Sequence, residues 1–525
     1  MKPICLLLLF APALFAGPLE LIRTDSWVYD ACDYLKTAGM VNTLPSASRP
    51  WTRSYAARLV SEAIENCRTH RPQGLAAHYL ARLQGEFHGE LPESQSLLQF
   101  RPHRPVLSIP VDSNRAIDFD LFDRLQADTV NQQGSVGALF KTRSRERFCA
   151  LIRMEFIVFR KSIRNAGDSL TGDSAGLKHA PGFREYVYHR TAVFDIPEAY
   201  LRFRIPWLDL DIGRQYLYWG PGFRSSVALS NTAPSFDLAR LTGDYRYFKI
   251  TAFTAALSPW QNKQRFLSAQ RLEVNLWDRV LIAPSLYVVH SLDPSSAQTK
   301  DLFGFINPLI PLYPEIANAG HDDNGLVSLD VAGYLPYVKL YAQVMADNFE
   351  ANVYNPKTPP NAIGYQAGLL ALPLPEFTVR YEYAGVTNFT YYHRIPFIAY
   401  TNFDVPLGHA LGPDADEHFL ELAWHPWVWG SVAVQGIATR RGGRNRGDWT
   451  ARVWIPGDST KYNVPEFPTG VVEQTVSLGP VLTFIPNSWL RLVGQVAWNR
   501  TVNLAGIAGD NRTALTFDAR LEFRY

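Results

Sequence analysis

The sequence has few cysteines, no excess charge of either sign and, after its first residues, no long hydrophobic run. Its 525 residues include 51 Lys and Arg against 49 Asp and Glu, a formal net charge of +2. This balance gives no reason to expect a nucleic acid or an acidic partner. No later apolar run approaches the ~18 residues that a transmembrane helix needs. We therefore do not expect the chain to cross a membrane with helices.

The first residues are typical of a secretory signal. Lys2 supplies a positive charge, and Ile4–Phe15 is a short apolar stretch. Ala16 is a small residue before a cleavage site, and cleavage could also follow Gly17. Cys5 lies too early in this stretch for a lipoprotein anchor. The sequence predicts export with a cleaved signal peptide at residues 1–16.

Cleavage would remove Cys5 from the four cysteines of the chain. Cys32 and Cys67 could then form a disulfide in an oxidising periplasm, which would leave Cys149 single. The alternative is that all three are small buried residues.

The last ten residues alternate strictly between apolar and polar side chains. The apolar members are Phe517, Ala519, Leu521, Phe523 and Tyr525, and the polar members are Thr516, Asp518, Arg520, Glu522 and Arg524. A strand with this period has one apolar and one charged face. A closed barrel leaves no unpaired edge, and within a membrane only closure satisfies the backbone of a sheet. We therefore predict a membrane barrel whose last strand is this segment.

The same alternation recurs from residue 147 onward. It is present in residues 147–158, 201–205, 208–212, 271–276, 338–344, 377–383 and 490–499. One such segment is a weak signal, but their repetition predicts a mainly β protein, a transmembrane antiparallel β-barrel. The abundance of aromatics (30 Phe, 25 Tyr, 13 Trp) with a mean hydropathy of −0.12 agrees with an aromatic-banded exterior and a polar interior. A soluble β-sandwich or a secreted carbohydrate-binding β protein would allow the same pattern. The signal peptide and the terminal strand favour the barrel.

The chain divides into a helical part and a barrel. Within residues 18–95 we expect three helices: from Asp25 or Ser26 to Ala38, from Thr52 onward, and from about Leu75 to Phe87. Short helices bury little alone, so this bundle should pack on the periplasmic end of the barrel, as a plug, a docking platform or a structural support. Residues 105–525 would form the barrel, and their length suits roughly 16 to 20 strands at ~10 residues per strand.

Two segments resemble a known family. Gly213–Pro234 has the sequence GRQYLYWGPGFRSSVALSNTAP, and Val405–Asp416 has VPLGHALGPDAD. With the Asn307-Pro308 pair and the N-terminal helices, they resemble the Wzi-type capsule-assembly proteins of Gram-negative outer membranes. The resemblance covers nearly the whole mature chain and is most specific at Arg214–Gly222 and Gly408–Pro413.

This resemblance implies a barrel of eighteen strands, preceded by a small N-terminal helical bundle and located in the outer membrane. It also implies that the protein attaches or organises exported capsular or other surface polysaccharide at the cell surface. Such an activity is lectin-like and needs no cofactor.

Residues in the first of the two segments suit a sugar. A sugar site needs flat aromatic faces, with amides and charged groups for hydroxyls and carboxylates. Trp219 lies beside a Gly-Pro-Gly turn, and Arg214, Gln215 and Arg224 are close to it in sequence. The alternative is that this segment shapes a turn and an aromatic girdle and binds nothing.

The alternation of residues 208–212 also predicts where these side chains point. Continued along the strand, it places Gln215 and Trp219 inward and Tyr216 and Tyr218 outward. It would place Arg214 outward as well, so we expect a bulge or the end of the strand at this point.

Polar groups also gather in expected loops. His409, Asp414 and Asp416, and likewise His321–Asn324, offer imidazoles and carboxylates to a sugar or calcium, but neither group matches a defined metal motif. Solvated loop charge is the alternative.

A basic, glycine-rich stretch contains Arg440 and Arg441, followed by Arg444 and Arg446. Guanidinium groups suit an acidic glycan or lipopolysaccharide phosphates. An exposed loop without a ligand is the alternative.

A hydrolase is the competing enzyme class, because Gly167–Leu170 (GDSL) matches the nucleophile block of one hydrolase family. That chemistry needs a histidine, usually from an Asp-x-x-His block, yet none of the twelve histidines has Asp three positions earlier. We predict a non-enzymatic protein without metal or cofactor, monomeric, in contact with polysaccharide, outer-membrane lipids and lipopolysaccharide and with no nucleic acid. A porin or sugar-transport channel is the alternative, since charged inward residues suit either an open or a packed lumen.

Overall fold

The computed structural model describes residues 19–67, 72–91, 107–112, 115–128, 131–143, 147–161, 192–205, 207–245, 247–292, 323–348, 361–443, 467–487 and 489–524. Several predictions lie outside these residues: the signal peptide at residues 1–16, Gly167–Leu170, Asn307-Pro308, His321, Arg444 and Arg446.

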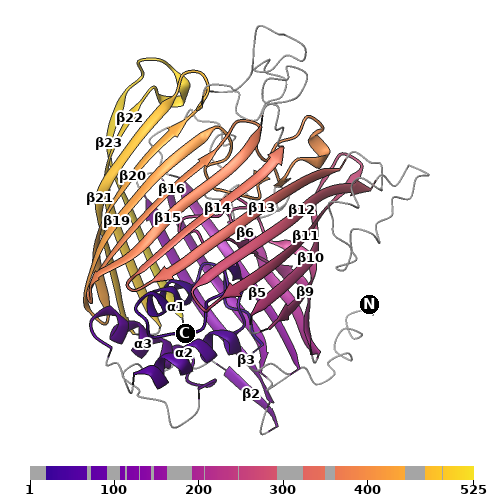
Figure 1. The fold of residues 1–525 in the computed structure, drawn as a ribbon, viewed down its shortest axis with the longest axis vertical. Helices are drawn as coiled ribbons and strands as arrows, with labels where there is room; N and C mark the ends of the chain where they lie inside the picture. Colours follow the sequence, from indigo (N-terminus) through magenta and orange to yellow (C-terminus); the bar gives the residue numbers. More distant parts are fainter. Residues whose placement is uncertain are drawn as a thin grey trace.

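Eighteen strands form one closed antiparallel barrel (Figure 1). They are β3 (Arg115–Asp128), β4 (Asn131–Arg143), β5 (Phe148–Lys161), β6 (Ala192–Ile205), β7 (Leu208–Gln215), β9 (Phe236–Asp244), β10 (Phe248–Trp260), β11 (Lys263–Leu276), β12 (Val280–Leu292), β13 (Asn324–Leu335), β14 (Val338–Asn348), β15 (Ala362–Leu374), β16 (Phe377–Val386), β19 (Ala415–Trp427), β20 (Gly430–Arg441), β21 (Glu473–Asn487), β22 (Leu490–Val502) and β23 (Arg512–Arg524). The predicted barrel, and the strand number implied by the resemblance, are confirmed.

The barrel closes between its last and first long strands. β23 pairs with the second half of β3, from Asp518 opposite Asp128 to Arg524 opposite Phe122. A short strand, β2 (Leu107–Asp112), pairs with the first half of β3, with Leu107 opposite Phe119. The predicted role of the C-terminal segment as the last strand is therefore confirmed.

The two ends of the barrel differ in their connections. At one end, which we call the short-turn end, tight turns join neighbouring strands, for example residues 336–337 between β13 and β14 and residues 375–376 between β15 and β16. At the other, the long-loop end, the described connections include residues 216–235 and 387–414. Both of these long segments fold into the barrel.

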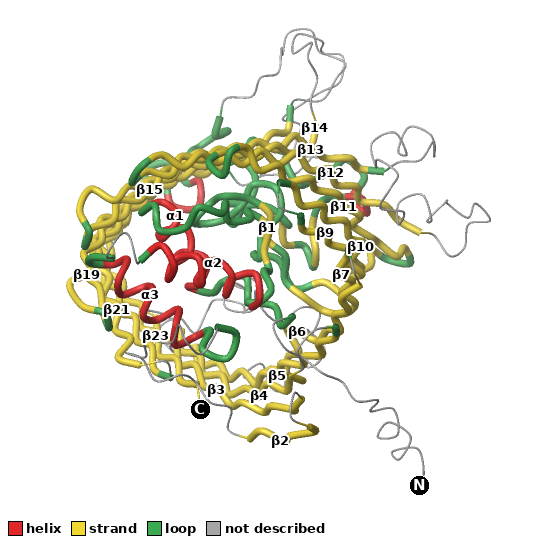
Figure 2. The backbone as a smooth tube through the Cα atoms, turned by 60° about the horizontal axis from the view of Figure 1, so that its bottom comes forward, coloured by secondary structure: helices red, strands yellow, loops and turns green. Residues whose placement is uncertain are grey.

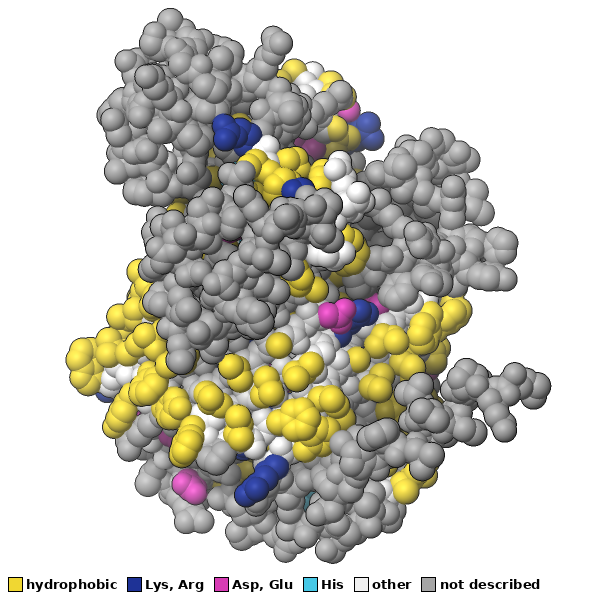
Figure 3. All heavy atoms as spheres, turned by 90° about the vertical axis from the view of Figure 1, so that its right-hand side faces the viewer, with side chains coloured by type: hydrophobic (Ala, Val, Ile, Leu, Met, Phe, Trp, Pro, Cys, Tyr) yellow, Lys and Arg dark blue, Asp and Glu magenta, His cyan; other side chains and the backbone are white. Residues whose placement is uncertain are grey.

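Apolar side chains cover the outside of the wall (Figure 3). On β5, Ile152 and Phe156 are 47% and 49% exposed, whereas their chain neighbours Leu151 and Ile157 are buried. The same alternation continues in the strands on both sides, with aromatic residues such as Trp277 at the turns. An exterior of this kind suits the hydrocarbon and interface of a bilayer.

Three helices lie within the mouth of the barrel at the short-turn end (Figures 1 and 2). They are α1 (Trp27–Thr37), α2 (Arg53–Asn66) and α3 (Leu75–Glu86). As predicted, Ser26 caps α1 by accepting from the Val28 amide, and Thr52 caps α2 by accepting from the Tyr55 amide. None of the described helices is long and apolar enough to span a membrane.

The three cysteines within the described residues carry free thiols. Cys32 is buried in α1, and the Cys67 thiol donates to the Ala63 carbonyl oxygen at 3.0 Å. Cys149 is buried on β5. The disulfide that the sequence allowed between Cys32 and Cys67 is not formed, because each thiol is accommodated within its own helix region.

Candidate functional site

The segment that carries the family resemblance leaves the wall and enters the lumen. β7 ends at Gln215, and the chain then forms a short strand, β8 (Tyr218–Trp219), which pairs with β1 (Ser48–Arg49) of the helical unit. At Gly220 the backbone has φ of 150°, and a Cβ there would lie 2.8 Å from side-chain atoms of both Gln343 and Ser226. Glycine is therefore required where this segment crosses the interior of the barrel.

Trp219 is the centre of an apolar core inside the barrel. Its side chain is fully buried and packs edge-on against Phe253 of β10, with ring centroids 5.1 Å apart. Tyr287 of β12 lies on another side of the ring at 5.6 Å. The predicted inward direction of Trp219 is thus observed, but in this conformation the ring has no face free for a sugar at the cell surface.

One buried amide and one buried carboxylate side chain of the wall hold this segment in place. Gln343 of β14 donates to the Trp219 carbonyl at 3.1 Å and accepts from the Val227 amide at 3.0 Å. Glu382 of β16 accepts from the amides of Phe223 and Arg224 at 2.7 and 3.1 Å. Neither residue was predicted from the sequence. Their inward parity on strands was readable, but no sequence signal identified the loop that they would bind.

A second long-loop segment, residues 387–414, covers the first. The Tyr391 hydroxyl donates to the Val227 carbonyl at 2.7 Å and accepts from the His409 amide at 3.0 Å. The Ser230 hydroxyl donates to the Gly408 carbonyl at 2.5 Å. The two segments that resemble the Wzi family, far apart in sequence, thus contact each other within the lumen.

Arg214 and Gln215 point to opposite sides of the wall. Arg214 pairs with Asp237 of β9 at 2.7 Å, and Asp237 belongs to the exposed, outward positions of that strand. The register from β7 to β9 is continuous, so the expected bulge is absent; the strand instead ends one residue later, at Gln215. Gln215 is buried, as its inward parity predicted.

The prediction that Tyr218 faces outward is wrong. The residue is buried, its hydroxyl donates to the Gly222 carbonyl at 2.7 Å, and the guanidinium of Arg49 lies 4.7 Å from the ring centroid. The alternation fails because the chain has already left the wall, and β8 pairs with the helical unit instead of a barrel strand. Tyr216, just past the end of β7, is half-buried.

Arg224 and His409 lie together in the lumen, towards the long-loop end. Arg224 pairs with Glu417 of β19 at 3.1 Å, and its guanidinium lies 5.1 Å from the Phe419 ring centroid. His409 is buried, and its Nδ1 accepts from the Leu411 amide at 3.2 Å. Burial, and to a smaller extent the nearby charge of Arg224, lower the pKa of His409 to about 3. The His409 side chain is therefore neutral at pH 7.

Asp414 joins two loops. It is buried, and its carboxylate accepts from the Thr469 amide at 3.0 Å and from the Thr469 hydroxyl at 2.5 Å. Among the described residues, no group of three His, Cys, Asp or Glu could hold a metal ion. Asp414 is thus placed to connect loops, with its oxygens already occupied.

Arg440 and Arg441 lie at the long-loop end of β20. Arg440 forms an ion pair with Asp416 of β19, and its side chain remains 49% exposed. Arg441 is half-buried and follows directly. The predicted residues therefore do not form one site. Gln215, Trp219, Arg224 and His409 share the lumen, Arg214 lies on the outer wall, and Asp414, Arg440 and Arg441 lie towards the rim.

Comparison with known proteins places this geometry in context. Residues 121–273, from β3 to β11, match the family model of the capsule assembly protein Wzi. The solved structure of Wzi from Escherichia coli has 13% sequence identity and a TM-score of 0.62, and the alignment covers 97% of this chain and 99% of that one. The predicted resemblance to the Wzi family is confirmed.

Porin-like barrels are more distant. OccAB4 of Acinetobacter baumannii has 9% identity and a TM-score of 0.45, with 79% of this chain and 99% of that chain covered. OprD of Pseudomonas aeruginosa has 10% identity and a TM-score of 0.41, with 78% and 93% covered. No curated protein matches the chain in sequence.

Proposed function

We propose that this chain is a non-enzymatic outer-membrane protein that binds or organises exported capsular or other surface polysaccharide. The packed lumen is the observation that carries the proposal. Loop residues such as Leu217, Tyr391 and Tyr400 are fully buried against the inward faces of β9 to β14, and the helices lie across the opposite mouth. A barrel filled in this way suits a surface binding protein better than a diffusion channel.

The similarity to Wzi supports the chemistry of the ligand. The Escherichia coli protein is an outer-membrane, carbohydrate-binding β-barrel involved in group 1 capsule assembly. We infer the same class of ligand for this chain, which would reach the outer membrane after removal of residues 1–16. We propose that it acts as a monomer, with outer-membrane lipid and lipopolysaccharide around the wall.

Within this proposal, Arg440 and Arg441 are the predicted residues best placed to meet an acidic glycan or a lipopolysaccharide phosphate. They lie at the long-loop end, and Arg440 keeps about half of its side chain exposed. The lumenal residues Trp219, Arg224, Gln215 and His409 would act indirectly, by holding the loops that surround the ligand.

The test is binding of the detergent-solubilised protein to the host's own surface polysaccharide, measured by calorimetry. We expect saturable binding that an Arg440→Ala/Arg441→Ala variant loses and an Arg491→Ala variant keeps. Arg491 is a suitable control because its side chain is 44% exposed at the short-turn end. Cells without the protein should synthesise the glycan but retain less of it.

Two results would contradict the proposal. One is unchanged retention of glycan by cells that lack the protein. The other is a steady open conductance of the purified protein in planar bilayers, which would indicate a channel.

A further inference from the structure

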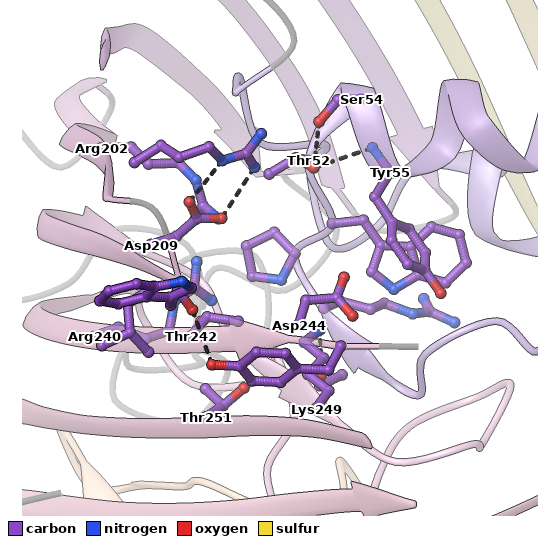
Figure 4. A pocket seen from close by; sticks show the side chains of 18 of the residues that line it. Thr52, Ser54, Tyr55, Arg202, Asp209, Arg240, Thr242, Asp244, Lys249 and Thr251 are labelled. Atoms are coloured by element: carbon purple, nitrogen blue, oxygen red, sulfur yellow. Dashed lines mark hydrogen bonds and ion pairs between the residues drawn. The ribbon is translucent and has the colours of Figure 1, made fainter. Parts of the chain in front are cut away.

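A cavity of about 510 Å³ lies between the helical unit and the barrel wall (Figure 4). The start of α2 forms one side, with Thr52, Ser54 and Tyr55. The parts of β6, β7, β9 and β10 near the short-turn end form the other side. Figure 4 shows Arg202, Asp209, Arg240, Thr242, Asp244, Lys249 and Thr251 on this side, facing the helix across the cavity. The volume is in the range of sites that hold small ligands.

The cavity opens at the short-turn end. Trp207, in the turn between β6 and β7, is 77% exposed, and Arg58 and Asp244 at the rim are also exposed. Deeper in the cavity, Arg202, Arg240 and Thr251 are buried. A ligand could therefore enter from the side opposite the long loops, which is the periplasmic side in the proposed orientation.

Cations outnumber carboxylates in the lining. Six lining residues are cationic (Arg49, Arg58, Arg202, Arg204, Arg240 and Lys249) and two are acidic (Asp209 and Asp244). Asp209 is already held by Arg202 and Arg204 at 2.6 and 2.8 Å. Behind the lining, the buried Asp211 pairs with Arg202 and Arg240 at 2.7 and 2.8 Å. These pairs fix the wall, and the positive charge that is left for an anion is that of Arg58 at the rim.

Arg58 is an exposed cation of this lining. Its guanidinium lies 5.1 Å from the centroid of the Tyr55 ring, and among the described residues it forms no ion pair. On the floor, the buried Arg202 has an Nε that makes no hydrogen bond with any described group. α2 also starts here without an acidic residue in its first turn, so its positive end is not neutralised by its own side chains.

The remaining lining residues suit a sugar. Trp51, Tyr55, Trp207 and Tyr245 supply aromatic surface, and Thr52, Ser54, Thr242 and Thr251 supply hydroxyls. Aromatic faces pack on the C–H groups of sugar rings, and hydroxyls exchange hydrogen bonds with sugar hydroxyls. Aromatics, hydroxyls and guanidinium groups are thus combined in one cavity.

We propose that this cavity binds an acidic sugar unit, one that carries a carboxylate, at the short-turn end of the barrel. This inference rests on the proposed function, because it gives the glycan a second contact on the periplasmic side. Arg58 binds the carboxylate at the rim, and Trp207 stacks on the ring. The ion pairs of Arg202 with Asp209 and of Arg240 with Asp211 hold the cavity open.

The experiment uses the full-length protein in detergent and two probes, a glucuronate-containing tetrasaccharide and its carboxyl-reduced, neutral counterpart. Binding is measured by calorimetry at two salt concentrations. We expect the acidic probe to bind at least about tenfold more tightly than the neutral one, and more weakly at high salt. Equal binding of both probes would overturn the acidic specificity.

Two variants test the location. Arg58→Ala should weaken binding of the acidic probe about tenfold, and Thr242→Trp, which fills the cavity, should abolish it. Arg512→Ala is the matched control, since this arginine is 68% exposed at the opposite end of the barrel. Heat-modifiable electrophoretic mobility confirms that each variant is folded.

The outcomes separate the two proposals. Binding of the acidic probe that neither cavity variant changes would overturn this site, and so would no binding at all by the folded protein. In either case, the proposed surface function would still be supported if cells with the wild-type protein retain the glycan and cells with the Arg440→Ala/Arg441→Ala variant do not.

Discussion

Two different bodies fill the barrel, and they are attached to its wall in different ways. The helical unit has its own apolar core, to which the wall contributes only Leu370 and Leu372 among the described buried residues. The loop segments 216–235 and 387–414 share one core with the wall itself, which includes Phe253, Leu267 and Tyr287. One body is docked, whereas the other is continuous with the barrel.

Polar contacts account for part of the docking of the helical unit, beside two small apolar clusters that join Leu21 to Tyr200 and Leu44 to Tyr341. Asp33 of α1 lies 2.5 Å from the Lys339 ammonium of β14, and Lys141 of β4 lies 3.2 Å from Glu20. Lys36 donates to the Asp278 carbonyl in the turn between β11 and β12. Such contacts are individually weak, while burial of large side chains is not. We therefore expect the barrel to depend on the loops more than on the helices.

The strongest test of this comparison is Trp219→Ala. Removing a fully buried tryptophan leaves a cavity between the loop and the strands, and we expect a loss of about 3–5 kcal/mol in the free energy of unfolding. Urea titration followed by far-UV circular dichroism measures the change. Trp277→Ala is the control, because this side chain is 81% exposed and its loss should cost about 1 kcal/mol or less. Similar values for both variants would show that the loop is not part of the core.

A smaller effect is expected from Tyr391→Phe. The substitution keeps the ring but removes the hydroxyl that links the Val227 carbonyl to the His409 amide. Leaving these buried groups unpaired should cost about 1–3 kcal/mol. Hydrogen exchange should become faster in both loop segments while the strands remain protected. Tyr337→Phe, at an exposed turn, is the control. Faster exchange throughout the barrel would contradict a local link between the loops.

The neutral, buried state of His409 makes the loop core sensitive to acid. An unfolded histidine titrates near pH 6.5, whereas His409 in the fold has a pKa of about 3. Between these pH values the unfolded state binds more protons than the folded state. The contribution of neutral His409 to the free energy of unfolding is therefore fully present above about pH 6.5 and is lost as the pH falls. At pH 5 the loss should be about 1–2 kcal/mol. His409→Asn, which cannot titrate, should unfold with less dependence on pH over this interval; an unchanged pH dependence would exclude His409 as its source.

The wall was predictable from the sequence because its signal is local and repeated. In β5, Ile152 and Phe156 point outward as the alternation requires. The helix starts at Ser26 and Thr52 were also predictable, since capping depends on a few neighbouring residues. Both features depend only on residues within one strand or one turn of a helix.

The interior was not predictable in the same way. Whether Trp219 lies in a loop at the surface or in a core depends on contacts with Phe253 and Tyr287, which no local pattern reveals. Tyr218 was assigned to the exterior because the alternation was extended past Gln215, where the strand ends. The cavity beside α2 combines residues from seven separate elements, and only the fold brings them together.

The smallest expected effect concerns the docked helices. Burial alone would raise the pKa of Asp33, but the Lys339 ammonium and the Tyr334 hydroxyl together lower it below its usual value, so the carboxylate is charged in the fold. Asp33→Asn keeps the size of the side chain and removes the charge. Because the site is partly exposed, we expect a cost of about 1 kcal/mol or less.

This cost should appear in the helices and not in the strands. Hydrogen exchange in α1 to α3 should become faster, while the urea midpoint of the barrel stays within error of the wild type. Glu65→Gln is the matched control, since Glu65 is exposed on α2 of the same unit. A lower midpoint for the barrel in Asp33→Asn would mean that the helical unit, like the loops, is continuous with the wall, and the contrast between the two bodies would be lost.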